Sequence, residues 1–351
     1  MEKYSQFRDR GSGISPFIPI NTPTTTFSTL VHAAIFLFRL PVFLTYCAFY
    51  FLFLTPLPLP QFLRKLLLWG MLGIPGIWWV DLQLDGVKRG SLSAQPSSRF
   101  PRARSIIAAQ FTSPIDALYL SAIFDPVFTV SYPGTQKVQR ISLLRAMTLA
   151  LAPPPQLPPR KTPKAKADLT TLRALVEKYP HRVIAVFPEM TTTNGKGILP
   201  LAPSLLSAPP DVQIFPISMR YTPADITTPV PGAYGGFLWN LLSRPTHLIR
   251  VRIAEAVLNT SAAAANGGVG DGYGVDVTGE RGVGGVQEEE EEEEEEETDD
   301  EDGEEEDLTA EEKQVLDRIG EALARLARNK RVGLTLKDKV GFIEAWNKGK
   351  K

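Results

Sequence analysis

The sequence has few of the residues that build disulfides and metal sites. Its 351 residues include one cysteine, Cys47, and three histidines, His32, His181 and His247. A single cysteine excludes an internal disulfide framework and any zinc site built on a cysteine cluster. The histidines lie too far apart along the chain to form a local metal motif, so we expect no metal site.

Acidic residues are scarce outside one segment. The whole chain is nearly neutral, with 38 Lys and Arg against 39 Asp and Glu, but residues 288–307 hold 18 of the acidic residues and no basic residue. The remainder therefore has 38 basic and 21 acidic residues, a net charge of +17. A basic body of this kind favours phosphate groups or anionic membranes as partners.

A long run near the N-terminus almost lacks charge. Residues 30–54 contain one charged residue, Arg39, and about 20 apolar residues suffice for a helix to span a bilayer. The run starts too late and is too long for a secretory signal peptide, and no small-residue cleavage site follows it. It is also long for a buried helix of a soluble protein, so we predict a membrane element.

A second apolar segment, residues 62–80, follows a Pro-rich turn and contains tryptophans that suit a membrane interface, Trp69, Trp78 and Trp79. Two arrangements are compatible with this pattern. In one, residues 30–54 span the bilayer and an interfacial helix follows. In the other, a hairpin dips into the membrane and returns, so that both ends stay on one face. Basic residues flank both sides, and the positive-inside rule does not separate the two arrangements.

The middle of the chain alternates strand patterns with helical patterns. Short apolar runs, typical of buried strands, occupy residues 105–110, 127–131, 183–187, 212–218 and 249–257. Helical patterns lie between them at residues 114–124, 141–151 and 169–179. The alternation predicts an α/β fold with a mixed, largely parallel sheet covered by helices, preceded by N-terminal membrane helices or a membrane hairpin.

Composition divides the chain into five regions. We expect an N-terminal segment (1–28), a membrane-embedded region (29–80), an α/β domain (81–258), a disordered Gly-rich and acidic insert (259–307) and C-terminal helices (308–351). Thr309 and Thr335 each begin a helix-start pattern. On the second of these helices, the expected apolar face is formed by Val340, Ile343 and Trp346.

Polar residues interrupt the ends of two expected strands. In residues 110–116, Ser113 and Pro114 could begin a helix whose first turn presents Asp116. In residues 187–195, Glu189 is followed by a run of donors and a glycine: Thr191, Thr192, Thr193, Asn194 and Gly195. Ligands of open α/β sheets bind outside the carboxyl ends of the strands, so these two segments predict a site.

These segments resemble the motifs of the glycerolipid acyltransferase family (phospholipid/glycerol acyltransferases), which acylates lysophosphatidate and glycerol phosphate from acyl-CoA. The family's first block is His-x4-Asp, matched in register by Phe111-x4-Asp116. Its third is Phe-Pro-Glu-Gly, often followed by Thr, Thr or Ser, and Asn-Gly, matched by residues 187–195. Pro216 matches the fourth block, and candidates for the basic second block are Lys137, Arg140 and Arg145. Residues 1–17 also resemble the opening of fungal lysophosphatidate:oleoyl-CoA acyltransferases.

Two positions depart from the family pattern. Phe111 stands where the family has its general-base His, and Met190 replaces the Gly of the third block. Phe111 cannot accept a proton, so the base could be Asp116, with its pKa raised by burial, or a phosphate oxygen of the acceptor. The structural alternatives are helix capping by Asp116 and turn building by the residues around Glu189.

The resemblance implies acyl-CoA-dependent acyl transfer to a lysophospholipid, with lysophosphatidate as the expected acceptor and phosphatidate as the product. It makes Asp116 the expected catalytic residue and assigns substrate binding to Glu189, Thr191, Thr192, Asn194, Gly195, Arg140 and Pro216. Acyl-CoA enters as a substrate, and neither a metal or redox cofactor nor a nucleic-acid partner is expected. The expected location is the endoplasmic reticulum membrane or a lipid droplet.

Two other classes of function remain open from the sequence. The first is a catalytically inactive protein with the acyltransferase fold that binds lipid as a scaffold, an alternative motivated by Phe111. The second is a membrane-shaping hairpin, which rests on residues 30–80 alone. Binding of acyl-CoA without turnover would select the first alternative.

Overall fold

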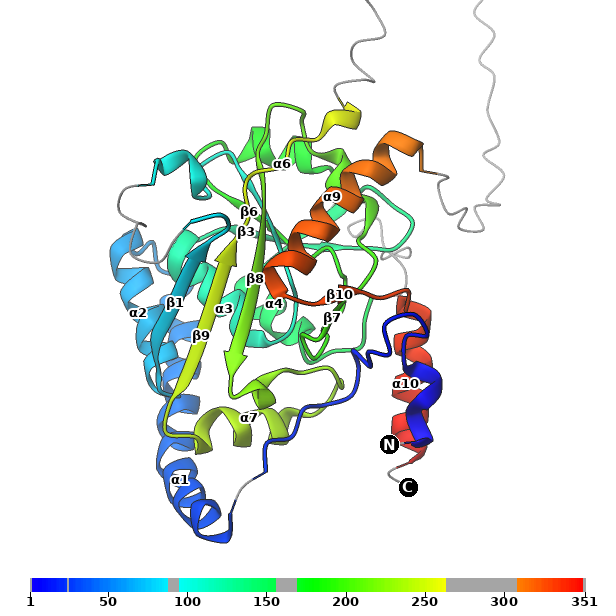
Figure 1. Ribbon diagram of the computed structural model, residues 1–351. Coiled ribbons are helices and arrows are strands. Elements are labelled where there is room, and N and C mark those ends of the chain that lie inside the picture. The colour runs from blue at the N-terminus through cyan, green and yellow to red at the C-terminus, as the bar shows by residue number, and fades with distance from the viewer. Residues whose placement is uncertain (1, 24, 88–94, 156–168, 263–307, 350–351) are drawn as a thin grey trace, which may run out of the picture.

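The computed structural model describes residues 2–23, 25–87, 95–155, 169–262 and 308–349. Its centre is an eight-stranded sheet with helices on both faces (Figure 1). In spatial order the strands are β1 (Ile77–Leu84), β9 (His247–Ile253), β8 (Ile214–Thr222), β2 (Ile106–Ala109), β6 (Ile184–Val186), β3 (Val127–Ser131), β4 (Val138–Ile141) and β5 (Leu169–Thr170).

The four central strands, β8, β2, β6 and β3, are parallel neighbours. At one side β9 runs antiparallel to β8 and parallel to β1, and at the other β4 and β5 add antiparallel edge strands. This mixed, largely parallel sheet confirms the fold class predicted from the sequence. The five expected strands correspond to β2, β3, β6, β8 and β9. The other three were not predicted, because β4 and β5 contain no continuous apolar run and β1 begins in a segment assigned to the membrane.

Alternating side chains on the central strands divide the core into two layers. Ile107 and Ala185 face the layer that contains α3 (Pro114–Phe124) and α4 (Leu143–Leu149). Ile106 and Ile184 face the layer that contains α6 (Leu172–Lys178) and α9 (Ala310–Ala327). The helical patterns predicted from the sequence are confirmed as α3, α4 and α6. The first turn of α3 lies at the carboxyl end of β2 and so presents its residues at that edge of the sheet.

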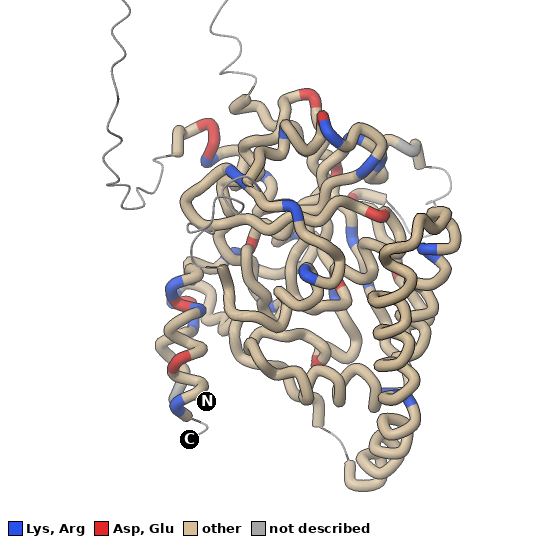
Figure 2. The backbone as a smooth tube through the Cα atoms, turned by 180° about the vertical axis from the view of Figure 1, so that it is seen from behind, with Lys and Arg blue, Asp and Glu red and all other residues tan. Residues whose placement is uncertain are grey.

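The N-terminal apolar run forms α1 (Thr26–Phe49), which continues through a π-helical turn (Tyr50–Leu54). Among the described residues it is the one helix long and apolar enough to cross a membrane, judged by length and composition. Large apolar side chains along it face solvent, including Phe27, Leu37, Phe38 and Leu52. In Figure 2 its backbone is almost free of the charged positions that mark the rest of the fold. One side of α1 packs on α7 (Tyr234–Ser243), where the rings of Phe36 and Trp239 lie 5.0 Å apart.

The second apolar segment does not form the single interfacial helix of the first of the two arrangements. It divides into α2 (Gln61–Gly73) and β1, so that Trp78 and Trp79 lie on an edge strand of the sheet with exposures of 66% and 73%. The chain turns at Gly76, whose φ is +87°, and a Cβ there would lie 2.4 Å from the carbonyl oxygen of Pro245. This close approach requires glycine and directs the chain into the sheet. The sheet thus begins a few residues before the boundary expected at residue 80.

The C-terminal region is ordered around the two expected helix starts. Thr309 and Thr335 each form a capping box, at the beginnings of α9 and α10 (Leu336–Lys348). Between them β10 (Lys330–Arg331) pairs with β7 (Gly197–Ile198). The disorder predicted for 259–307 falls almost entirely outside the described residues. On α10 the fully buried side chains are Lys339 and Phe342, because the helix docks on the N-terminal segment. Of the expected apolar face, Trp346 packs on the same small core.

That N-terminal segment lies beside α10 (Figure 1). It begins with the 3₁₀ helix η1 (Glu2–Phe7), and the rings of Phe7 and Phe342 meet edge to face at 5.4 Å. Phe17 is also fully buried in this small core. The remaining short 3₁₀ helices are η4 (Ser97–Arg99), η5 (Pro203–Ser207) and η6 (Ala224–Ile226).

Candidate active site

The polar loops that follow β2 and β6 lie together at the carboxyl edge of the sheet. The two strands are parallel neighbours, with Ala108 opposite Val186. The N–H of Thr193 donates to the carbonyl oxygen of Phe111 over 3.1 Å. The rings of Phe111 and Phe187 stack with their centroids 4.3 Å apart. The loops therefore meet, as their positions after neighbouring strands predict.

Asp116 is enclosed by hydrogen-bond donors at the start of α3. Ser113 is the N-cap and Pro114 takes the first helical position. Asp116 Oδ2 accepts from the N–H of Ser113 at 2.8 Å and from the N–H and hydroxyl of Thr112 at 2.6 and 3.1 Å. Oδ1 accepts from the hydroxyl of Tyr221 on β8. Three of these donors are bonded to Oδ2 and one to Oδ1, so both oxygens of a side chain with 0% exposure are engaged within the fold.

Burial raises the pKa of Asp116 to about 6, although the hydrogen bonds from Tyr221, Thr112 and Ser113 act in the opposite direction. Burial and the neighbouring carboxylate raise the pKa of Tyr221 well above its ordinary value, so that its hydroxyl remains a donor. The raised pKa of Asp116 agrees with the hypothesis that it acts as a base. Its closed set of hydrogen bonds favours the capping alternative.

Glu189 is buried as deeply as Asp116 but is bonded far less. Its exposure is 0%, and Oε2 accepts a hydrogen bond from the N–H of Leu199 at 3.1 Å. Oε1 has no hydrogen bond of standard geometry within the described residues, although the N–H of Phe111 lies close enough to lower the pKa of the carboxyl. Buried polar atoms normally have a partner, so this oxygen is suited to a ligand group.

Burial raises the pKa of Glu189 to about 8, and the charge of Asp116 adds to the increase. At neutral pH the folded protein therefore holds Glu189 mainly as a carboxylic acid. In that form it can donate one hydrogen bond, which a carboxylate cannot do. An oxygen of a phosphate or a hydroxyl group is the acceptor that this arrangement suits.

The threonines after Glu189 fold the loop back on itself. The N–H of Thr191 donates to the carbonyl oxygen of Glu189 at 2.7 Å. Thr192 Oγ1 donates to the carbonyl oxygen of Thr228 at 2.6 Å and so ties the loop to the segment after η6. Both threonine side chains are buried. These contacts fit the turn-building alternative, and substrate binding by Thr191 and Thr192 stays a prediction.

Asn194 and Gly195 connect the same loop to the chain termini. The side-chain amide of Asn194 donates to the carbonyl oxygens of Ser15 and Ile18, both at 2.8 Å. Gly195 has φ of +73°, a conformation that favours glycine, and its carbonyl oxygen accepts from the side chain of Asn329. The positions have clear structural roles, and their predicted contact with substrate is untested.

Arg140 and Pro216 lie away from the two carboxyl groups. Arg140, on β4, donates to the hydroxyl of Tyr179 at 2.6 Å and covers its ring at 5.2 Å. Tyr179 follows α6, on the face of the sheet opposite α3. Pro216 is buried inside β8 opposite Ala108. The structure does not bring either residue to Asp116 or Glu189, and their binding roles stay predictions.

No histidine of the described chain forms a hydrogen bond with either carboxyl group. His181 lies exposed just before β6, at the end of that strand opposite Glu189. His247 is buried at the start of β9, where its Nε2 lies 2.8 Å from the carbonyl oxygen of Leu241 and burial lowers its pKa. Over the described residues, no three His, Cys, Asp or Glu side chains are grouped to hold a metal ion.

Comparison with known proteins identifies the family. No family model matches the chain. A Schizosaccharomyces pombe protein named "Putative lysophosphatidic acid:oleoyl-CoA acyltransferase" is 30% identical over 277 residues, which cover 74% of this chain and 85% of that protein. The chain belongs to the lysophosphatidic acid:oleoyl-CoA acyltransferase family. Lysophosphatidic acid:oleoyl-CoA acyltransferase 1 of Saccharomyces cerevisiae is 24% identical over 211 residues, 58% of this chain and 61% of that protein.

Family membership confirms the resemblance and favours an acyltransferase over the lipid-binding scaffold. It also gives the two departures from the wider acyltransferase pattern a structural context. Phe111 uses its ring to stack on Phe187 beside a cavity of about 20 Å³, room for roughly one water molecule. Met190 has φ of +58°, the left-handed conformation for which glycine is preferred. The glycine of the general motif thus fits this turn better than the methionine that occupies it.

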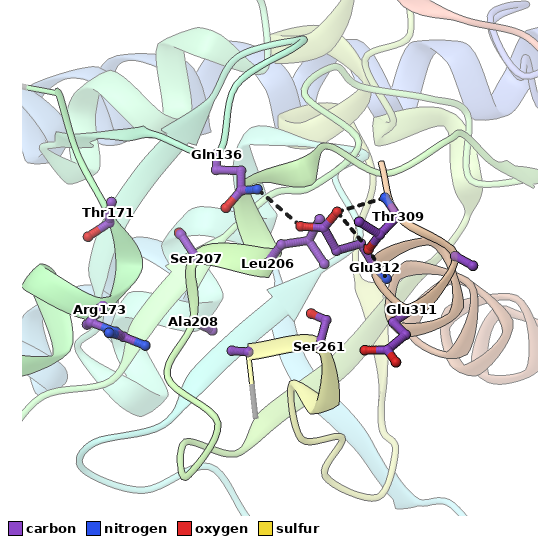
Figure 3. A pocket seen from close by; sticks show the side chains of 12 residues that line it. Gln136, Thr171, Arg173, Leu206, Ser207, Ala208, Ser261, Thr309, Glu311 and Glu312 are labelled. Atoms are coloured by element: carbon purple, nitrogen blue, oxygen red, sulfur yellow. Dashed lines mark hydrogen bonds between the residues drawn. The ribbon is translucent and has the colours of Figure 1, made fainter. Parts of the chain in front are cut away.

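A larger cavity lies away from these carboxyl groups, at the ends of α6 and α9. Its volume is about 760 Å³, and Figure 3 shows polar side chains from several elements around it. They include Gln136, Thr171, Arg173, Ser207, Ser261, Glu311 and Glu312. Glu312 accepts from Gln136 at 3.4 Å and belongs to the capping box of α9. None of these residues belongs to the acyltransferase motifs, so size alone does not mark the site.

Two residues at the carboxyl edge were not identified from the sequence. Tyr221, which donates to Asp116, lies on β8 and carries no local motif. Lys339, on α10, donates to the carbonyl oxygen of Thr192 at 2.8 Å. Lys339 is one of three lysines between residues 337 and 348, and it lies outside the apolar face expected for this helix. The tertiary contact, rather than any sequence signal, distinguishes it.

Proposed function

We propose that this protein transfers an acyl group from acyl-CoA to the free hydroxyl of lysophosphatidate and forms phosphatidate. The hydroxyl oxygen bonds to the thioester carbonyl carbon, the C–S bond breaks, and the hydroxyl proton finally resides on the CoA thiol. The observation that carries the proposal is the 30% identity over 85% of a relative named for this acceptor and oleoyl-CoA. The basic body of the chain supports two anionic substrates.

Glu189 is proposed as the acceptor-binding residue of the site. Its unpartnered Oε1 and its protonated form at neutral pH suit a hydrogen bond to an acceptor oxygen. Thr191, Thr192, Asn194 and Gly195 would contribute by fixing the shape of the loop, and Arg140 and Pro216 by more distant contacts. In this proposal, the positive charge of the chain outside residues 288–307 attracts the anionic substrate, and the hydrogen-bond donors at the carboxyl edge of the sheet then bind it.

The proton is proposed to leave the acceptor hydroxyl without a side-chain base. Asp116 was one candidate, but both oxygens of its carboxylate already accept hydrogen bonds, from Ser113, Thr112 and Tyr221. A phosphate oxygen of lysophosphatidate is the other candidate, and the enclosed state of Asp116 supports it. The thioester is already activated, so positioning can supply much of the rate enhancement. Acyl-CoA is then a substrate, and no further cofactor is part of the proposal.

The membrane arrangement is proposed to be a hairpin that enters one leaflet. Arg39, in the middle of α1, donates to the carbonyl oxygens of Pro75, Arg244 and Pro245 at 3.2, 2.6 and 3.0 Å. If α1 crossed the bilayer, those loops would lie at its centre, where polar backbone is costly. The N-terminal segment before α1 also packs on α10, which supports both ends of the hairpin being on one side.

The proposed location is the endoplasmic reticulum membrane, with the lipid-droplet monolayer as a second location. A hairpin can reside in either membrane because neither of its ends has to cross. Exposed Trp78 lines the groove between α1 and α2 and extends their apolar surface toward the sheet. A fluorescent fusion of the full chain, compared with markers for both compartments, tests this assignment.

The test of activity is an assay of the full-length protein in membranes with radiolabelled oleoyl-CoA and a panel of lysophospholipids. We expect labelled phosphatidate from lysophosphatidate, strong loss of product for Glu189→Ala, and retention by Glu177→Ala, which alters an exposed glutamate on α6. Absence of turnover by the wild type with every lysophospholipid would overturn the proposal. Turnover with another lysophospholipid alone would reject lysophosphatidate as the acceptor.

A further inference from the structure

A fully buried lysine of the C-terminal helix reaches the loop that carries Glu189. Lys339 lies on α10 with 0% exposure, whereas Lys337 on the same helix is exposed. Lysine is almost never fully buried unless its ammonium is paired. In the described chain the contacts of Nζ are two backbone carbonyl oxygens and the ring of Phe17, whose centroid is 5.0 Å away.

The two carbonyl groups belong to different loops at the carboxyl edge of the sheet. Nζ donates to the carbonyl oxygen of Thr192 at 2.8 Å and to that of Pro229. Thr192 lies three residues after Glu189. Pro229 follows Thr228, whose N–H donates to the carbonyl oxygen of Thr112 at 2.8 Å. Lys339 therefore joins the Glu189 loop to the 226–230 segment, which is itself bonded to the loop that leads into α3.

The convergence of two carbonyl oxygens on one nitrogen explains why a donor is needed there. Both oxygens carry partial negative charge and are directed at the same point, so without a shared donor they would repel each other and stay unpaired. An ammonium satisfies both. Burial lowers the pKa of Lys339 to about 7, and the neutral amine still has two N–H bonds, enough for both carbonyl groups. The link therefore does not depend on the protonation state.

The same loop is also held from the N-terminal side. The side chain of Asn194 donates to the carbonyl oxygens of Ser15 and Ile18. Phe17, between them, packs against Lys339 and against Phe342 of α10, with 5.8 Å between the two ring centroids. The Glu189 loop is thus enclosed by both chain termini.

We propose that Lys339 is a positioning residue of the active site: by joining the carbonyl groups of Thr192 and Pro229, it sets the placement of the Glu189 loop. The expected effect on kinetics rests on the proposed function. The joining of the two loops can be tested without any measurement of activity. It gives the C-terminal helices, which lie beyond the acyltransferase motifs, a role in acceptor binding.

The first test measures kinetics of the full-length protein in membranes with lysophosphatidate as the varied substrate. Lys339→Met keeps an unbranched side chain but removes the donors, and we expect kcat/KM to fall about tenfold or more, mainly through a higher KM for the acceptor. Lys337→Met is the matched control and should retain wild-type values. A lower kcat with unchanged KM and unchanged loop exchange would mean only a smaller folded fraction and would overturn the proposal.

The second test is hydrogen–deuterium exchange of the purified full chain in detergent micelles. Lys339→Met should exchange faster at residues 189–199 and 226–230, which contain the bonded amides of Thr193 and Thr228, with no change at the sheet amides of β2 and β6. If this variant does not fold, Lys339→Gln, which retains two N–H donors, should show the same pattern with smaller amplitude. Unchanged exchange in both loops overturns the proposal, whether or not the wild type makes phosphatidate.

Discussion

The two buried carboxyl groups at the carboxyl edge of the sheet have opposite surroundings. Asp116 and Glu189 both have 0% exposure, and burial raises the pKa of each. Asp116 accepts four hydrogen bonds from Ser113, Thr112 and Tyr221. Within the described residues, Glu189 accepts one of standard geometry, from Leu199, and its Oε1 accepts none.

This difference separates a residue that builds the site from one that is available to a ligand. The hydrogen bonds of Asp116 fix the first turn of α3 and the strand β8 relative to each other. A substrate that bound Oδ2 would have to displace one of its three donors. Within the described residues, Oε1 of Glu189 has no hydrogen bond of standard geometry, so a ligand group can bind it without displacing one. Depth of burial alone would have ranked the two residues equally, and their hydrogen bonds decide between them.

The largest effect is expected from Asp116→Ala, which tests whether Asp116 is structural. The change leaves the N–H groups of Thr112 and Ser113 and the hydroxyl of Tyr221 buried without their acceptor. We expect a loss of at least about 3 kcal/mol in the free energy of unfolding, and roughly 6–12 °C in melting temperature. Glu189→Ala removes the carboxyl group from the N–H of Leu199 and from the nearby N–H of Phe111, and should cost about 1–2 kcal/mol.

Thermal unfolding of both variants in detergent micelles, beside the wild type, makes the comparison. A normal melting temperature for Asp116→Ala together with complete loss of turnover would reverse our assignment and restore Asp116 as the base. Equal destabilisation by Asp116→Ala and Glu189→Ala would remove the distinction between the two residues.

The next effect concerns Phe111→His, which restores the residue of the wider family. A histidine acting as a base would need an acceptor to orient it, and the oxygens of Asp116 are already occupied. The change also removes the stack on Phe187 and buries an imidazole. We expect no gain in phosphatidate formation and a loss of about 2–3 kcal/mol in stability. Phe111→Leu, which stays apolar, should lose about half as much.

Turnover by Phe111→His above the wild-type level, measured with radiolabelled oleoyl-CoA, would contradict this expectation. It would mean that Asp116 can exchange one of its donors for the imidazole. The hydrogen bonds of Asp116 would then no longer distinguish it from Glu189, because both carboxyl groups could accept a new partner.

The sequence predicted the sheet well because its central strands are short apolar runs, such as residues 183–187, bounded by turn residues. It predicted α3 to the residue because Ser113, Pro114 and Asp116 form a local capping signal. It missed β1 because Trp78 and Trp79 continue an apolar stretch, and only the close contact of Gly76 with Pro245 shows that the chain has entered the sheet. The sequence therefore predicted an element correctly where residues close together in the chain determine it, as in α3, and missed it where a distant residue does, as in β1.

The site was predictable in part for the same reason. Parallel strands bring their carboxyl ends to one edge, so the meeting of the Asp116 and Glu189 loops followed from the strand order. The partners of the two carboxyl groups did not follow. Tyr221 and Lys339 reach this edge from β8 and α10, over more than 100 residues of sequence, and neither position has a local pattern that distinguishes it.

A third prediction uses pH to isolate Glu189. The carboxyl has a pKa of about 8 when folded and near its ordinary value of 4.5 when unfolded. Its contribution to stability is therefore full below pH 4.5 and declines until about pH 8, because only the unfolded chain is ionised in between. Glu189→Gln cannot titrate. From pH 6 to 8 the wild type should lose roughly 2 kcal/mol relative to this variant.

Melting temperatures of the two proteins across that pH range supply the measurement. Lys339, whose pKa is lowered to about 7, changes stability in both proteins and cancels in the difference. Asp116, whose pKa is raised to about 6, titrates at the lower end of this range, and its charge is part of the measured effect because it raises the pKa of Glu189. Parallel curves for wild type and Glu189→Gln would show that Glu189 is ionised in the folded protein. That result would mean that Oε1 has a hydrogen-bond donor, which stabilises the carboxylate.

The smallest effect tests the backbone of the two loops. Residues 110–116, all within the described chain, include no positive φ, whereas Met190 beside Glu189 has φ of +58°. A left-handed residue other than glycine costs about 1–2 kcal/mol, and glycine returns about 0.4–1 kcal/mol of that through the unfolded chain. Met190→Gly should therefore raise stability by about 0.5–1 kcal/mol, measured by denaturant unfolding, and Met190→Ala, which keeps the strain, should not.

A loss of stability in Met190→Gly as large as in Met190→Ala would mean that the methionine side chain, packed beside Phe111 and Phe187, outweighs the backbone strain. The strained turn next to Glu189 would then be held by its side chains, as the Asp116 turn is held by its hydrogen bonds.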